Sequence, residues 1–254
     1  MRIFIADNAD AAYALAADTL NGAVRQYPTG VFCLPTGGTA AHVYEQWVPA
    51  LRREGLSLLG LAVFNLDEYH PIAPDHPESY RNYMQQRLFR FFPPGRQEIP
   101  NGQAPDPDAE AERYEQAIAA AGGIDYLFLT LGHNGHIAFN EPGESFGTRT
   151  RKIRLTESTI AANARFFDRP QDVPTHALTM GIRTIMAARH LLFVATGVGK
   201  APAVRAMLEG PLTTALPASV LRLHPDVTVI LDADAAAALS EEARLALGRP
   251  SKGE

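Results

Sequence analysis

The chain has 254 residues, of which 46% are hydrophobic and 20% are charged, and its formal net charge is −5. This composition provides for a sizeable core, excludes a disordered chain, and contains no basic block of the kind that binds nucleic acid. The single cysteine, Cys33, excludes an internal disulfide, and no apolar leader or run of about 20 apolar residues is present, so we expect a cytoplasmic protein without a membrane span.

Short apolar runs alternate with amphipathic stretches along the chain. The runs expected to form strands are Arg2–Ala6, Val31–Pro35, Leu59–Leu66, Ile124–Leu131, Leu191–Thr196 and Val227–Asp232. Helical spacing covers Ala9–Gln26, Ala40–Glu54, Pro77–Phe92 and Asp108–Ala121, and a further helix is expected to begin near Pro202. Near-continuous apolar strands separated by helices predict an α/β fold, with a mostly parallel sheet covered by helices on both faces.

The proline-rich loops of the chain do not have the composition of domain linkers. We therefore expect a single α/β domain over residues 1–247 and a frayed tail over residues 248–254. The stretch Thr148–Thr179 shows no clear strand pattern, and we expect it to form a small cap region on that domain.

Polar residues follow four of the predicted strands, at the edge of a parallel sheet where ligands bind. The first group is Thr36, Gly37, Gly38 and Thr39, directly before a helix. The glycines let backbone N–H groups approach a ligand, and the hydroxyls and the helix N-terminus complete an anion-binding nest. The segment matches neither a Walker A loop nor a dinucleotide-binding fingerprint. A plain strand-to-helix turn is the alternative interpretation.

Charged residues mark two further strand ends. Asp67 and Glu68 come directly after a buried strand, where a carboxylate is either a general base or a helix cap. Lys200 ends the sequence TGVGK just before a helix, where a cation opposes the helix dipole unless an anion binds there too. Its alternative role is that of a solvated surface lysine. Arg165 is a second candidate cation, with an ion pair to Asp168 as its alternative role.

The fourth strand end is the glycine-bounded loop Leu131–Gly143. It carries His133, Asn134, His136 and Glu141. Imidazole titrates near neutral pH and therefore suits proton transfer. A metal site with the two histidines and Glu141 as ligands is the alternative, but the chain has no H-E-x-x-H motif and no cysteine cluster. The loop predicts acid–base chemistry without a metal.

Several stretches of the chain resemble the glucosamine-6-phosphate deaminase family in order and spacing, namely LPTGGT, FNLDEY, HPESY, NGHIAFNEP, ARFFD and LHPDVTVILD. The resemblance extends from Arg2 to Leu247, and NGHIAFNEP is its most specific part. It implies a modified Rossmann-like fold, similar to that of ribose-5-phosphate isomerase and 6-phosphogluconolactonase. It also implies the conversion of glucosamine 6-phosphate and water to fructose 6-phosphate and ammonia, with no cofactor.

The resemblance assigns roles to the polar residues. Asp67 is the base that moves a proton between C2 and C1, His136 assists opening of the sugar ring, and Glu141 holds and polarises His136. Asn134 completes the catalytic set. The residues that the resemblance assigns to the substrate phosphate are Thr36, Gly37, Gly38, Thr39, Arg165 and Lys200. The implied partner is a small phosphorylated amino sugar, bound by a monomer or a homo-oligomer.

Three alternatives remain open from the sequence. They are a galactosamine-6-phosphate isomerase, a 6-phosphogluconolactonase, and a non-catalytic sugar-phosphate sensor. Some hexameric members of the family bind an activator through a serine pair and an Arg-x-Lys motif. This chain has Glu144 and Ser145 at the first pair and Arg151 and Ile153 at the second. The resemblance therefore predicts that this form of activation is absent.

Overall fold

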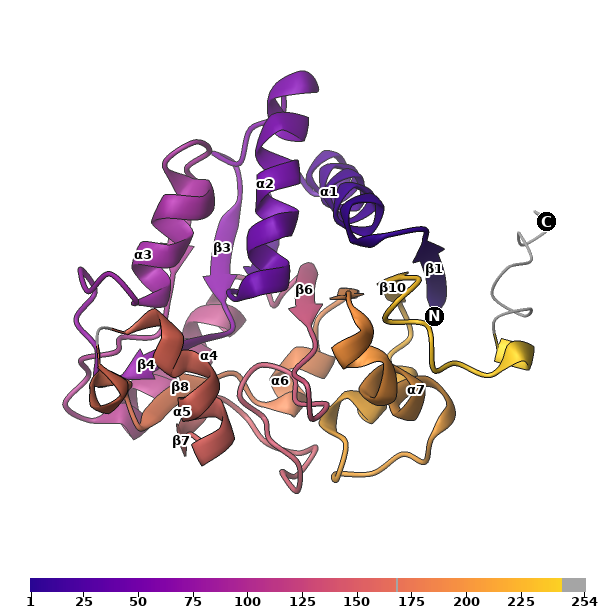
Figure 1. Cartoon of the computed structure of the whole chain (residues 1–254). Coiled ribbons are helices and arrows are strands. Elements are labelled where there is room, and N and C mark those ends of the chain that lie inside the picture. Colours follow the sequence, from indigo (N-terminus) through magenta and orange to yellow (C-terminus); the bar gives the residue numbers. More distant parts are fainter. Residues whose placement is uncertain (168, 244–254) are drawn as a thin grey trace.

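The computed structural model describes residues 1–167 and 169–243, and its main sheet has seven strands, all parallel. Their order across the sheet is β1-β10-β9-β6-β2-β3-β5 (Figure 1). The bounds are β1 Arg2–Ala6, β2 Val31–Leu34, β3 Ala62–Asn65, β5 Arg96–Glu98, β6 Tyr126–Thr130, β9 His190–Ala195 and β10 Val227–Asp232. Each predicted strand is confirmed. Strand β5 was missed because it has three polar residues at the sheet edge and no apolar run.

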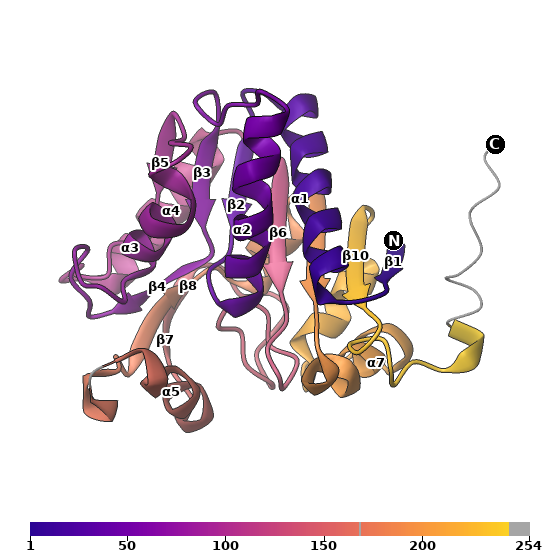
Figure 2. The same ribbon diagram turned by 45° about the horizontal axis from the view of Figure 1, so that its top comes forward.

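Helices cover both faces of this sheet, as predicted. Helices α1 (Ala9–Gln26) and α2 (Gly38–Arg53) lie side by side over one face (Figure 2). The other face packs against α4 (Pro107–Ala120), α6 (Ile182–Met186) and α7 (Ala201–Glu209). Successive residues of a strand point to opposite faces, so Phe32 joins the first core and Cys33 the second. This explains why the central strands are apolar at every position.

The predicted helix Pro77–Phe92 is shorter than expected and changes type along its length. It begins as α3 (Tyr80–Met84), because the Ser79 hydroxyl accepts the N–H of Asn82 and so caps the first turn. It continues as a π-helix over Gln85–Phe89.

A second, three-stranded antiparallel sheet has the order β4-β8-β7. Its strands are β4 Asp67–His70, β7 Arg151–Arg154 and β8 His176–Thr179, and the turns α5 (Glu157–Asn163), η2 (Ala164–Phe166) and η3 (Pro170–Asp172) connect β7 to β8. The prediction that Thr148–Thr179 lacks strands is therefore wrong. Strand β7 reads RKIR and β8 has four residues, so neither displays a recognisable apolar pattern. We call residues 148–179 the cap.

No helix within the two described ranges is both long enough and apolar enough to cross a membrane. The remaining described helical turns are η4 (Val198–Lys200) and η5 (Pro217–Leu223). The predicted tail, residues 248–254, lies outside the described residues.

Candidate active site

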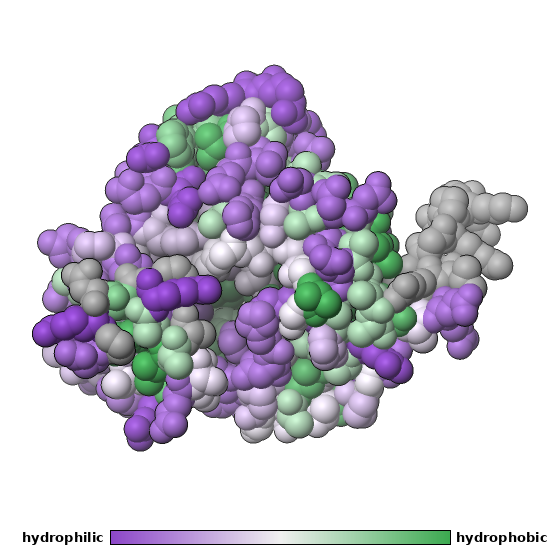
Figure 3. Space-filling view, viewed as in Figure 1, coloured by the Kyte–Doolittle hydropathy of each residue, from purple (hydrophilic) through white to green (hydrophobic). Residues whose placement is uncertain are grey.

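The four strand ends singled out in the sequence belong to β9, β6, β2 and β3, which are consecutive neighbours in the sheet. The chain adds strands in one direction from β2 to β3 and β5, and in the other from β6 to β9 and β10. The carboxyl ends of β2 and β6 thus form the switch point at which open α/β sheets bind ligands. A cavity of about 530 Å³ lies there, and the molecular surface is hollowed between the cap and the main sheet (Figure 3).

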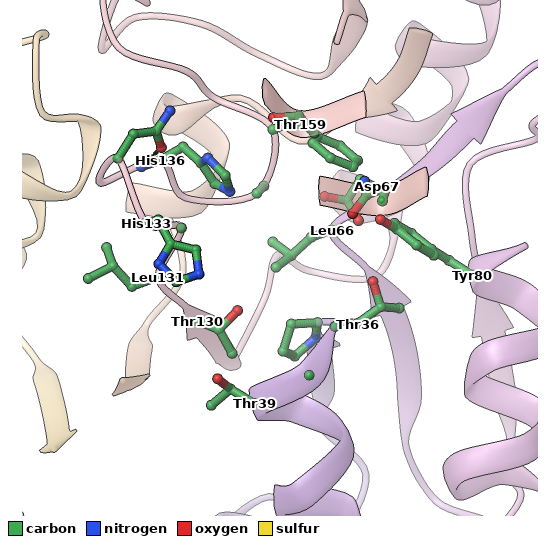
Figure 4. Close-up of a pocket in the computed structure, with 18 of the residues that line it drawn as sticks. Thr36, Thr39, Leu66, Asp67, Tyr80, Thr130, Leu131, His133, His136 and Thr159 are labelled. Atoms are coloured by element: carbon green, nitrogen blue, oxygen red, sulfur yellow. Dashed lines mark hydrogen bonds between the residues drawn. The ribbon is translucent and has the colours of Figure 1, made fainter. Parts of the chain in front are cut away.

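The cavity brings together nearly every residue predicted for the site. The predicted residues that line it are Thr36, Gly37, Gly38, Thr39, Asp67, His133, Asn134, His136, Arg165 and Lys200. Glu141 lies just behind this wall, in contact with Asn134 and His136. Asp67 and His136 lie on opposite sides of the cavity, and Thr36 and Thr39, around the start of α2, lie along a third side (Figure 4).

The nest at the start of α2 has the features of an anion site. Gly37 is the N-cap residue with φ 100°, a conformation that favours glycine, and it has no side chain to cap the first turn. The first turn contains no acidic residue. Its N–H groups and the positive end of the helix dipole therefore remain available to a ligand.

Two cations face the same cavity. Lys200 precedes α7, and burial lowers the pKa of its ammonium group to about 8, since no described carboxylate stabilises its charge. Arg165 reaches the cavity from the η2 turn of the cap. The pairing with Asp168 considered from the sequence lies outside the described residues. An anion in the cavity would meet a helix N-terminus and two positive side chains.

Asp67 and Glu68 follow β3, and the sequence left two roles open for a carboxylate there, a helix cap or a general base. Glu68 accepts the backbone N–H groups of Tyr69, Tyr80 and Arg81, and so helps to cap the turn that begins α3. The carboxyl group of Asp67 faces the cavity and receives no hydrogen bond from the described residues. Burial, and then the charge of Glu68, raise the pKa of Asp67 to about 8. A carboxyl group with a high pKa is a strong base once it is deprotonated.

The loop after β6 holds a second carboxylate in a different environment. The Glu141 Oε1 atom lies 3.5 Å from Nδ1 of His136, and its Oε2 atom accepts the amide of Asn134 at 2.7 Å. Asn134 also accepts the backbone N–H of His136 at 3.2 Å, so it fixes both partners. Gly132 lies against the His136 ring and leaves no room for a side chain there.

Hydrogen bonding outweighs burial at Glu141. Burial alone would raise the pKa of this carboxyl group, but His136, Thr159 and Asn134 together lower it to about 2. Glu141 is therefore a fixed negative charge that faces the imidazole of His136.

His133 does not belong to this pair. Its ring lies at the rim of the cavity, with Nδ1 3.4 Å from the carbonyl oxygen of Gly199. Over residues 1–167 and 169–243, no group of three or more His, Cys, Asp or Glu side chains is arranged to hold a metal ion. A reaction without a metal stays a prediction.

Several lining residues were missed from the sequence, namely Tyr80, Thr130, Phe139, Ser158, Thr159 and Asn163. Tyr80 belongs to HPESY, one of the stretches that carry the family resemblance, so the sequence did offer a signal for it. Its ring stacks on Phe139 with centroids 6.2 Å apart. Thr159 comes from the cap, where the sequence shows no periodic pattern. Only the folded structure brings it to the cavity.

The fold is that of an α/β protein of Rossmann type, and its cavity places a helix N-terminus and two cationic side chains beside histidines and a buried carboxyl group. Residues 6–230 match the family model described as glucosamine-6-phosphate isomerases/6-phosphogluconolactonase. The protein belongs to this family.

Its relatives support the same assignment. The glucosamine-6-phosphate deaminases of Geobacillus sp. (strain WCH70) and Rhodopirellula baltica are each 46% identical to it, over 96% of this chain and 98% of theirs. A solved structure of a monomeric glucosamine-6-phosphate deaminase is 41% identical and superposes with a TM-score of 0.91, over 94% of this chain and 100% of that one. A 6-phosphogluconolactonase from Trypanosoma cruzi, 20% identical with a TM-score of 0.74 over 94% of this chain and 97% of that one, shares the fold.

Proposed function

We propose that the protein is a glucosamine-6-phosphate deaminase, which converts glucosamine 6-phosphate and water to fructose 6-phosphate and ammonia. The observation that carries the proposal is the arrangement around the cavity, with Asp67 on one side, His136 on the other, and the nest before α2 on a third (Figure 4). A phosphorylated amino sugar needs one site for its phosphate and two separate proton-transfer groups. Its compartment, on this proposal, is the cytoplasm, which fits the lone buried Cys33.

The phosphate is assigned to the nest formed by Thr36, Gly37, Gly38 and Thr39, together with Lys200 and Arg165. Charge-assisted hydrogen bonds to phosphate are among the strongest available to side chains, and the helix N-terminus adds to them. An anion beside Lys200 also stabilises the ammonium form of that lysine, whose pKa burial has lowered to about 8. The phosphate thereby anchors the sugar between Asp67 and His136.

The two sides of the cavity divide the proton transfers. His136, held by Glu141, moves the proton between the O1 hydroxyl and the ring oxygen and so opens the ring. Asp67 then takes the proton from C2 and returns it to C1 through an enolamine. Water hydrolyses the resulting imine and releases ammonia. The ammonium group of the arriving substrate favours the ionised form of Asp67, so binding helps to generate the base.

The alternatives differ in what they require of the site. A 6-phosphogluconolactonase needs no base at C2, whereas Asp67 is buried at the cavity with a raised pKa. A non-catalytic sensor needs no His136–Glu141 pair. Galactosamine 6-phosphate differs from glucosamine 6-phosphate only in the configuration at C4, and no single residue of the cavity distinguishes the two configurations.

One assay separates these possibilities. The purified protein is given glucosamine 6-phosphate, galactosamine 6-phosphate or 6-phosphogluconolactone, and ammonia, fructose 6-phosphate and acid release are followed. We expect stoichiometric ammonia and fructose 6-phosphate from the glucosamine compound. Acid release from the lactone alone, or binding without turnover, would overturn the proposal.

We also propose that the protein works as a monomer without an activator. The Arg151 guanidinium lies 2.8 Å from the Glu144 carboxylate, and it also donates to Asn140 at 3.0 Å. The positive charge at this position is thus already engaged within the chain, and Ile153 cannot bind an anion. Hyperbolic kinetics that N-acetylglucosamine 6-phosphate leaves unchanged are the expected result, and a sigmoidal curve would contradict it.

A further inference from the structure

The cap supplies a hydrogen bond to the catalytic loop through Thr159. The Thr159 hydroxyl lies 2.8 Å from Glu141 Oε1, the same oxygen that faces His136 Nδ1. Thr159 is 8% exposed and borders the cavity (Figure 4). The bond joins α5 of the cap to the loop after β6, through two residues that are 18 positions apart in the chain.

The direction of this hydrogen bond is fixed by its neighbours. A carboxylate only accepts, so the single hydroxyl proton of Thr159 must be donated to Glu141. The hydroxyl of Thr156 in turn donates to Thr159 at 2.9 Å and accepts the backbone N–H of Thr159 at 3.2 Å. Because Thr156 is the N-cap of α5, the start of that helix orients the Thr159 hydroxyl.

Each oxygen of Glu141 thus has a close donor. Asn134 holds Oε2 at 2.7 Å from within the loop, and Thr159 holds Oε1 at 2.8 Å from the cap, where the Thr156 hydroxyl makes a second, longer contact at 3.4 Å. His136 Nδ1 is buried and makes no hydrogen bond within the described residues, and Oε1 of Glu141 lies 3.5 Å from it. A carboxylate fixed at both oxygens presents Oε1 to the imidazole in one orientation, whereas one fixed only at Oε2 can swing away from it.

We propose that Thr159 is a positioning residue for the His136–Glu141 pair, and that ring opening depends through it on the placement of the cap. The inference rests on the proposed function. It assigns to the cap a part in the acid–base step, in addition to the Arg165 contact with the phosphate.

The test compares two substitutions at one position. Thr159→Val keeps the shape and removes the hydroxyl, whereas Thr159→Ser keeps the hydroxyl. A hydrogen bond to a charged group typically corresponds to about a 10-fold to 100-fold effect, so we expect kcat of Thr159→Val to fall at least about 10-fold with little change in KM. Thr159→Ser should remain within about 3-fold of the wild type. Thermal unfolding of both variants checks that they fold.

A double-mutant cycle decides whether Thr159 acts through Glu141. In the Glu141→Gln background, adding Thr159→Val should lower kcat by less than about 2-fold, since the carboxylate that Thr159 positions is gone. A full additional loss, a rise in KM alone, or a Thr159→Val protein as active as the wild type would each overturn the inference. If the wild type releases no ammonia, the proposed function itself has failed.

Discussion

Two regions of the cavity wall each carry a buried carboxyl group, and the two groups behave in opposite ways. Asp67 at the start of β4 is 7% exposed and Glu141 in the loop after β6 is 9% exposed. The pKa of Asp67 is raised to about 8, whereas that of Glu141 is lowered to about 2. Burial raises the pKa of both groups, and the neighbours of each carboxyl group decide whether that rise is offset.

The neighbours of each carboxyl group account for the difference. Glu141 faces His136 and accepts hydrogen bonds from Thr159 and Asn134, while the backbone N–H groups near Asp67 are donated to its neighbour Glu68. A carboxylate with several donors is stabilised as the anion, and one without them is stabilised as the acid. One wall of the cavity therefore holds a permanent charge, and the other holds a group that can exchange its proton.

The largest expected effect comes from removing the exchangeable proton. Asp67→Asn keeps the size of the side chain but abolishes the base, so kcat should fall by roughly 10²-fold or more. KM for glucosamine 6-phosphate should change little, because the phosphate contacts remain. Steady-state kinetics on protein with an unchanged circular-dichroism spectrum test this. Near-normal turnover would remove Asp67 from its role.

A smaller effect is expected on the opposite wall. Glu141→Gln removes the fixed charge beside His136 and should lower kcat by about 10-fold to 100-fold, as for loss of hydrogen bonds to a charged group. Asn134→Ala leaves that charge in place and should cost distinctly less. If Asn134→Ala proves the more damaging of the two under identical assay conditions, orientation rather than charge governs the pair.

The pH dependence of kcat/KM should reveal the raised pKa of Asp67. The base form grows as pH rises toward about 8, so kcat/KM should increase over this range. Above about 8 the Lys200 ammonium loses its charge in the free enzyme, and phosphate binding should weaken. We therefore expect a maximum near pH 8.

A substitution at Glu68 tests whether Asp67 controls the rising limb of the kcat/KM profile. The charge of Glu68 is the second cause that raises the pKa of Asp67. Glu68→Gln should therefore move the rising limb to lower pH and leave the falling limb in place. A rising limb that stays where it is would mean that another group controls it.

The smallest effect concerns stability, and it has opposite signs at the two positions. Between its unfolded pKa of 3.8 and its folded pKa of about 8, Asp67 binds more protons when folded, so its contribution to stability decreases as pH rises. Asp67→Asn should therefore raise Tm at pH 8 and change it little at pH 4.

Glu141 follows the reverse rule, since its pKa falls from 4.5 to about 2 on folding. Its stabilisation is complete above about 4.5 and is lost as pH falls toward 2. Glu141→Gln should lower Tm at pH 7, and less so at pH 3. Shifts of about 2–4 °C per kcal/mol are expected for a chain of this size and can be measured by calorimetry. Tm shifts of the same sign for Asp67→Asn and Glu141→Gln would contradict the opposite pKa shifts of the two groups.

Much of the fold could be predicted because it depends on local pattern. The six apolar strands and helix α1 follow from runs of side chains that the sequence displays directly. The main site could be predicted for a related reason. Parallel strands bring their carboxyl ends to one edge, so polar residues after four strands had to converge. The small sheet was missed because β7 and β8 are four-residue strands without an apolar run, and β8 pairs with both β4 and β7.

The sequence by itself determined the α/β class and the polar residues that converge on the cavity. Only the tertiary structure decided what each acidic residue does. It gave the backbone donors to Glu68, left Asp67 without them, and brought Thr159 from the cap onto Glu141. These outcomes depend on donors contributed by segments distant in the chain. The pKa of a buried group is set by such neighbours, and the identity of the residue alone does not fix it.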